Sequence, residues 1–188
     1  MEAIAKACQE GNIPATIELV ISNQTNVKGL ERAKKFHLMS KVIEHQQFNS
    51  REEFDQALLE QILPIEPDLV VLAGFMRILS KPFITKYKNR IINIHPSLLP
   101  LFPGANAHRD VIKSGVKESG CTVHFVDEGV DTGPIIMQET VAVDKNDSEE
   151  TLAAKILPLE HLIFPKALHL LTSKKLEIKE GKVIIRSD

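Results

Sequence analysis

The sequence is poor in the residues that mark several broad classes of protein. Its 188 residues include only two cysteines, Cys8 and Cys121, a single tyrosine and no tryptophan. Two thiols so far apart in the chain predict neither a disulfide framework nor a zinc site, and they favour a reducing compartment. We therefore expect no metal and no dependence on disulfides.

Excess charge of either sign is also missing. Lys and Arg number 23 against 25 Asp and Glu, for a formal net charge of -2. This balance gives no electrostatic reason to expect nucleic acid or an anionic membrane as a partner. No apolar run approaches about 18 residues, and no basic segment followed by an apolar stretch opens the chain, so neither a membrane span nor a signal peptide is predicted. A cytoplasmic protein that acts on small molecules is expected.

Apolar residues alternate between helical and strand spacing, which is typical of an α/β fold. Helices are predicted over 2–10, 28–37, 51–63, 83–87, 107–114 and 147–172, the last with kinks or breaks at Pro158 and Pro165. Strands are predicted over 16–22, 68–74, 91–95, 120–126 and 134–143, with a weak hairpin over 176–185. Residues 1–188 are expected to form a single domain with a Rossmann-like, open, twisted and mostly parallel sheet that has helices on both faces.

Two polar side chains lie at the end of a predicted buried strand. Asn93 and His95 are two residues apart, just before Pro96, so they point to the same face of the sheet. In open α/β sheets, ligands bind at the carboxyl ends of the strands. An isolated pair of this kind is more often a loop cap and a buried structural histidine. The pair alone therefore does not define a site.

Longer motifs around this strand resemble the folate-dependent formyltransferases. Residues 93–104 contain Asn-Ile-His-Pro-Ser-Leu-Leu-Pro and then Phe-Pro-Gly, and residues 120–136 end in Val-Asp-Thr-Gly-Pro-Ile-Ile. The likeness includes Gly74–Ser80 and extends with lower density from residue 2 to about 172. It is greatest for the branch of this family that formylates glycinamide ribonucleotide in purine synthesis.

The resemblance implies transfer of a formyl group from 10-formyltetrahydrofolate to the amine of glycinamide ribonucleotide, without a metal. It matches Asn93 and His95 to the Asn-x-His of the family, and Asp131 to the acid of its Val-Asp-x-Gly-Pro loop. Asn93 and a protonated His95 would donate hydrogen bonds to the negative oxygen of a tetrahedral adduct. Asp131 would favour the imidazolium and assist proton transfer. Without the resemblance, Asp131 would be interpreted as a turn residue.

The resemblance also implies residues for each substrate. The folate pteridine would lie against mostly apolar side chains, with the backbone of the loop after residue 126 facing its polar edge. The residues matched to the folate site are Arg51, Arg77, Ile78, Leu79, Ile84, Ile91, Val126, Asp127, Glu128, Gly129 and Val130. Arg51 would approach the acidic tail of folate, although a solvated arginine in a first helical turn is an equally good interpretation. Met76 and Glu160 would line the ribonucleotide side, where Glu160 would accept hydrogen bonds from ribose hydroxyls; a surface acid after a helix kink is an equally good interpretation of Glu160.

The sequence departs from the family pattern at its start. In the family, a strand and a loop that holds the substrate phosphate precede the helix matched to Ala3–Glu10, and here Met1 stands where that loop would end. The first strand of the sheet is therefore expected to be missing, with unpaired backbone that favours association, for example as a homodimer. Weak or absent nucleotide binding is also expected. Leu157 stands where some relatives carry a polar residue near the nucleotide.

Two alternative functions are a formyltetrahydrofolate hydrolase and a truncated, non-catalytic folate-binding relative. The hydrolases usually carry an extra N-terminal domain and a second histidine after the Asn-x-His, where this chain has Pro96. The presence of Asn93, His95 and Asp131 together argues against a non-catalytic copy. His108 and His124 also lie in or near the similar stretches; we interpret both as structural residues or as residues that support the catalytic side chains without reacting.

Overall fold

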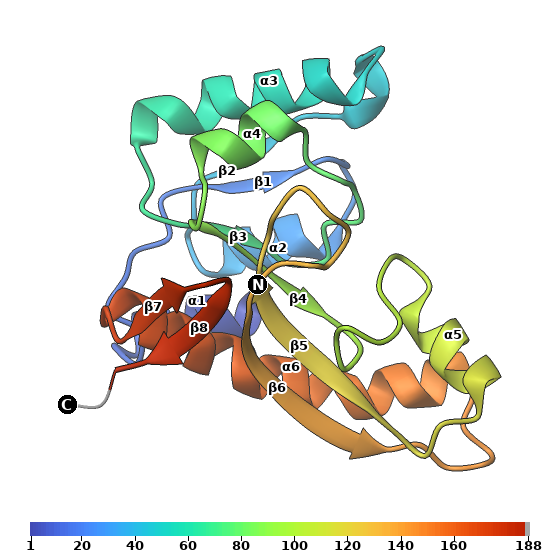
Figure 1. The fold of residues 1–188 in the computed structure, drawn as a ribbon. Helices are drawn as coiled ribbons and strands as arrows, with labels where there is room; N and C mark the ends of the chain where they lie inside the picture. The colour runs from blue at the N-terminus through green and yellow to red at the C-terminus, as the bar shows by residue number, and fades with distance from the viewer. Residues whose placement is uncertain (187–188) are drawn as a thin grey trace.

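In the computed structural model, which describes residues 1–186, helices cover both faces of a mixed sheet (Figure 1). The four-stranded sheet has the order β3 Val70–Leu72, β4 Ile91–His95, β5 Glu118–Phe125 and β6 Ile135–Ala142. β3 and β4 are parallel, whereas β4, β5 and β6 pair antiparallel. The Rossmann-like α/β class is thus confirmed. The sheet is mixed where the sequence led us to expect mostly parallel strands, because the turn-rich segment after β5 returns the chain beside it as a hairpin.

Four further strands form two smaller sheets. β1 Val20–Ser22 pairs parallel with β2 Ser40–Val42, and β7 Leu176–Lys179 forms the predicted hairpin with β8 Lys182–Ile185. β2 was not predicted, since its three residues are all exposed and lack an apolar pattern. Within residues 1–186, β1 pairs only with β2, and β3 only with β4. One edge of each strand therefore has no strand partner within these residues.

The helices form two groups. Their bounds are α1 Glu2–Gln9, α2 Lys28–Lys35, α3 Arg51–Ile62, α4 Lys81–Lys86, α5 Ala107–Ser114 and α6 Glu149–Thr172, with short 3-10 turns η1 His45–Gln47 and η2 Leu63–Ile65. α6 packs against α1, α5, β5 and β6, whereas α3 and α4 lie together on the other side of the sheet (Figure 1). α6 continues through Pro158 and Pro165 as one helix, so the expected breaks do not occur. It buries Ile156, Ile163 and Phe164 around these prolines, and this packing offsets the lost backbone hydrogen bonds.

Two apolar cores lie on opposite faces of β4, and they determine where its polar residues point. Ile92 belongs to the core shared with α1 and α6, and Ile91 belongs to the core shared with α3 and α4. Because strand side chains alternate, Asn93 and His95 project on the same face as Ile91. Among residues 1–186, no helix is long and apolar enough to span a membrane.

Candidate active site

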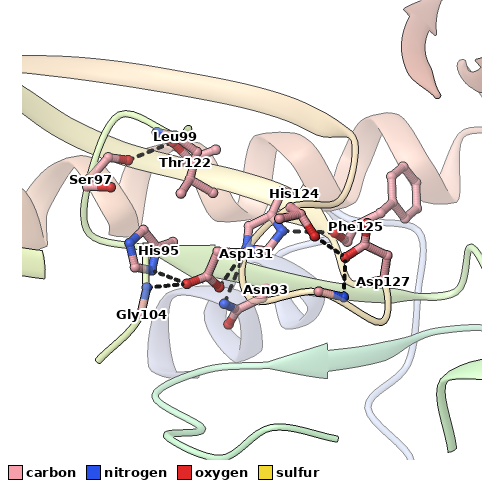
Figure 2. A network of polar contacts seen from close by, with 12 residues as sticks. Asn93, His95, Ser97, Leu99, Gly104, Thr122, His124, Phe125, Asp127 and Asp131 are labelled. Atoms are coloured by element: carbon pink, nitrogen blue, oxygen red, sulfur yellow. Dashed lines mark hydrogen bonds and ion pairs between the residues drawn. The ribbon is translucent and has the colours of Figure 1, made fainter. Parts of the chain in front are cut away.

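The three side chains predicted to be catalytic meet at the carboxyl end of β4 (Figure 2). The Nδ1 atom of His95 lies 3.3 Å from Oδ2 of Asp131. The amide nitrogen of Asn93 lies 3.4 Å from Nε2 of His124, and that nitrogen lies 3.6 Å from Oδ1 of Asp131. An amide, two imidazoles and a carboxylate from β4, β5 and the β5–β6 loop thus form one cluster. No group of three or more His, Cys, Asp or Glu side chains able to hold a metal occurs in the described part of the chain.

The surroundings of His95 decide which of its ring nitrogens can take part in chemistry. His95 is buried, and its Nε2 atom lies 2.8 Å from the carbonyl oxygen of Phe102. A carbonyl oxygen only accepts hydrogen bonds, so Nε2 carries a proton and donates it there. Nδ1 is therefore the nitrogen that faces Asp131, and a proton on Nδ1 would point at its carboxylate.

His124 orients the amide of Asn93. Its Nδ1 atom lies 2.8 Å from the carbonyl oxygen of Phe125 and must donate to it, while burial lowers the pKa of the imidazole below its ordinary value. In the neutral ring, Nε2 is an acceptor, so the NH2 group of Asn93 donates to it. Of the two roles that the sequence left open for His124, this contact favours support of a catalytic side chain. Asn93 and His124 are directly paired across β4 and β5, a register that neither strand reveals by itself.

The carboxylate of Asp131 is held by a second loop. Its Oδ2 atom accepts a hydrogen bond of 2.8 Å from the backbone N–H of Gly104. Asp131 has a φ of 55°, in the left-handed region that non-glycine residues seldom adopt. Nearby, Oδ1 of Asp127 accepts from the N–H of Gly129 and the hydroxyl of Thr132, at 3.1 and 2.7 Å. The β5–β6 loop is thus tied to itself and to the segment that follows β4.

A buried polar network fixes the chain just after His95. The hydroxyl of Thr122 donates to the carbonyl of Ser97 at 2.6 Å and accepts from the N–H of Leu99 at 3.1 Å. The side-chain nitrogen of Gln138 donates to the same hydroxyl and to the carbonyl of Leu99, both at 2.9 Å. Thr122 is paired with His95 across the strands, so the network supports the site from the neighbouring strand.

Most residues predicted to bind folate lie on the side of β4 covered by α3 and α4. Leu79, Ile84 and Ile91 are buried in that core, and Val126 packs against it. Ile78 and Val130 are 50% and 45% exposed. Leu79, Ile84, Ile91 and Val126 thus share the face that carries Asn93 and His95, and the predicted site adds the partly exposed Ile78 and Val130; we call these six residues the apolar wall.

The charged residues predicted on the folate side have protein partners of their own. Arg77 lies over the ring of Phe54, with 5.3 Å between its guanidinium carbon and the ring centroid. Glu128 pairs with Lys81 at 3.3 Å. Arg51 is exposed in the first turn of α3 and pairs with its neighbour at 3.0 Å. Binding of the folate tail by Arg51 stays a prediction.

A pocket of about 260 Å³ lies on the α6 side of Pro96. Its lining residues are Pro96, His108, Ala153, Ala154, Ile156, Leu157 and Glu160. Burial raises the pKa of Glu160, and burial together with nearby His95 lowers the pKa of His108. Met76, predicted on the same side as Glu160, is 70% exposed and is not among these lining residues.

Comparison with known proteins places this chain in a family. Residues 1–168 match the family model described as formyl transferase. The chain is 41% identical over 181 residues to phosphoribosylglycinamide formyltransferase of Escherichia coli (strain K12), an alignment that covers 96% of this chain and 85% of that protein. The chain therefore belongs to the formyl transferase family.

Within that family, the chain is similar to proteins named for glycinamide ribonucleotide. The crystal structure of glycinamide ribonucleotide transformylase 1 from Symbiobacterium toebii matches with a TM-score of 0.96 and 45% identity, covering 99% of this chain and 88% of that one. The trifunctional purine biosynthetic protein adenosine-3 of Homo sapiens is 45% identical over 184 residues, 97% of this chain. The chain spans 18% of the length of that trifunctional relative.

Proposed function

We propose that this chain transfers the formyl group of 10-formyltetrahydrofolate to the amine of glycinamide ribonucleotide, a step of purine biosynthesis, and that it does so in the cytoplasm. The observation that carries the proposal is the convergence of Asn93, His95 and Asp131 at the end of β4, with 3.3 Å between the imidazole and the carboxylate. The names of the Escherichia coli and Symbiobacterium toebii relatives support the choice of substrate.

The proposed reaction forms a bond between the substrate amine and the formyl carbon, and it breaks the bond from that carbon to folate N10. As the amine attacks, the π electrons of the formyl group become a lone pair on its oxygen. The NH2 group of Asn93, held by His124, would stabilise that oxygen by a hydrogen bond, and a protonated His95 would stabilise it by its positive charge while its Nδ1 proton stays directed at Asp131. Asp131 would accept the proton that the amine loses and return it to N10, directly or through His95. The lone pair then re-forms the carbonyl, so protons and charge balance.

The two substrates would approach from different sides of the β4 terminus. The apolar wall and the loop after Val126 would hold the pteridine, whose flat heterocycle fits an apolar surface with a few fixed polar groups. The pocket that contains Glu160 would take the ribose on the α6 side. The reacting nitrogen atoms would then meet beside Asn93, His95 and Asp131.

Turnover with both substrates tests this proposal. We expect the purified protein to release tetrahydrofolate only when glycinamide ribonucleotide is present, and mass spectrometry to find the formyl group on the amine. Release of formate without the nucleotide would instead identify a hydrolase. Folate binding with neither product would identify a non-catalytic relative.

A further inference from the structure

Two consecutive residues of α3 hold the two ends of the segment 77–80, which leads into α4. At one end, the guanidinium carbon of Arg77 lies 5.3 Å from the ring centroid of Phe54. At the other end, the carboxyl oxygen Oδ2 of Asp55 accepts a hydrogen bond from the backbone N–H of Ser80. The segment is therefore fastened to α3 at its first and last residues.

Asp55 is an unusual residue for its position. It is 1% exposed and borders the apolar core formed in part by Leu58, Leu59 and Leu79. Burying a carboxyl group is unfavourable unless hydrogen bonds compensate, and an apolar residue of similar size often gives equal or greater stability at such a site. The carboxyl group instead contributes a specific contact, because it fixes the position of the Ser80 backbone. Ser80 is itself 2% exposed.

The ring of Phe54 is itself held in place. It packs edge-on against Phe48, with 5.7 Å between ring centroids and 63° between planes, and against His45 at 6.3 Å and 77°. Phe54 has no exposed surface. Arg77 thus lies on a ring whose position is fixed. This contact holds the backbone at the start of the segment, and the contact with Asp55 holds it at the end.

We propose that Asp55 is a positioning residue for folate binding. With Phe54, it sets the backbone of 77–80 so that Ile78, which is half exposed, faces the pteridine while the neighbouring Leu79 stays anchored in the core. This inference rests on the proposed function, because it assigns the wall to folate. Asp55 does not reach the nucleotide pocket or the reacting atoms, so its effect falls on one substrate alone.

Substitution at Asp55 separates positioning from general stability. For Asp55→Ala, we expect the KM for 10-formyltetrahydrofolate to rise about tenfold, while kcat and the KM for glycinamide ribonucleotide change by no more than about twofold. Asp55→Asn retains an oxygen that can accept from Ser80, and it should restore the folate KM to within about twofold of the parent. Leu58→Ala is the matched control, because it removes apolar volume from the same core and leaves both fastening contacts. It should lower stability without raising the folate KM.

A folate KM that is unchanged in Asp55→Ala, or an Asp55→Asn protein as impaired as Asp55→Ala, would overturn the positioning role. If Asp55→Ala does not fold, Phe54→Leu carries the test, since it keeps apolar volume but removes the ring beneath Arg77; a folate KM equal to that of the parent would then refute the inference. Equilibrium dialysis of the parent protein with 10-formyltetrahydrofolate distinguishes failure of the proposed function from failure of the positioning role. A parent that neither binds folate nor turns over refutes the proposed function itself, whereas an active parent with unaffected variants refutes only the role of α3.

Discussion

The Nδ1 atom of His95 lies 3.3 Å from the Oδ2 atom of Asp131, although one residue ends β4 and the other belongs to the loop between β5 and β6. The imidazole and carboxylate side chains are 5% and 15% exposed. Because these groups are shielded from water, salt screens the electrostatic attraction between them only weakly. Asp131, the carboxylate of this pair, is therefore the first residue to replace.

Replacing Asp131 with Asn should lower the rate of formyl transfer by about 10²–10³-fold. The amide can still accept from the N–H of Gly104, so the loop is expected to stay in place, but it cannot take the proton of the amine. The measurement is kcat, from the appearance of tetrahydrofolate. Asp144→Asn, at a carboxylate that is 73% exposed, is the control and should be as active as the parent. An Asp131→Asn enzyme with more than about a tenth of the parental rate would contradict this role.

Replacing His124 with Gln should flatten the dependence of stability on pH. Burial lowers the pKa of His124, so the unfolded chain binds more protons than the folded one between that lowered pKa and the ordinary value of about 6.5. The contribution of neutral His124 to the free energy of unfolding is complete above about pH 7, and it is lost as the pH falls through that window. Urea unfolding at a series of pH values measures the slope.

His108 also has a lowered pKa, so His108→Gln provides the comparison for the same series. Each substitution should remove part of the slope, and the double variant should be the flattest. A His124→Gln protein that loses stability towards acid as steeply as the parent would show that His124 is not kept neutral by the fold.

Replacing Thr122 with Val should destabilise the protein by about 2–3 kcal/mol. The shape of the side chain is kept, but the N–H of Leu99 and the side chain of Gln138 lose their shared acceptor. Chemical denaturation measures the free energy of unfolding. Thr140→Val, at an exposed position of β6, is the control and should cost little. Equal effects of the two substitutions would argue against the network.

Replacing Glu160 with Gln should stabilise the protein at neutral pH while weakening nucleotide binding. Burial raises the pKa of Glu160, so the cost of ionising it in the fold is absent below the ordinary glutamate pKa and complete once the pH has risen through the raised value. The melting temperatures of parent and variant should therefore converge in acid and separate towards neutral pH. A variant no more stable at neutral pH would be evidence against a desolvated carboxylate there.

The sequence predicts best where local patterns are sufficient. The strand at Ile91–His95 and the helix over 107–114 have the predicted bounds, because an apolar run that ends at a proline and a helical apolar spacing are local signals. The shared face of Asn93 and His95 follows from strand alternation alone. The proximity of Asp131 was implied only by the family resemblance.

Features that depend on distant pairing were not predictable from local pattern. β2 is an exposed strand whose residues Ser40–Val42 become a strand only by pairing with β1. His124 meets Asn93 through the antiparallel register of β4 and β5. Asp55 follows Phe54 on a helix with no distinguishing motif, and its partner Ser80 lies in another segment. In each case, the role of the residue is determined by a partner that is distant in the sequence.

Through its hydrogen bond to Asp131, Gly104 fixes the position of an acid in another loop, although glycine itself has no reactive group. Gly104 has a φ of 88°, which residues with a Cβ atom rarely adopt. A substitution there would relocate the N–H that holds the carboxylate and carry the acid away from His95. We therefore expect substitutions of Gly104 to lower activity, and a search for inactivating variants confined to the polar residues would overlook them.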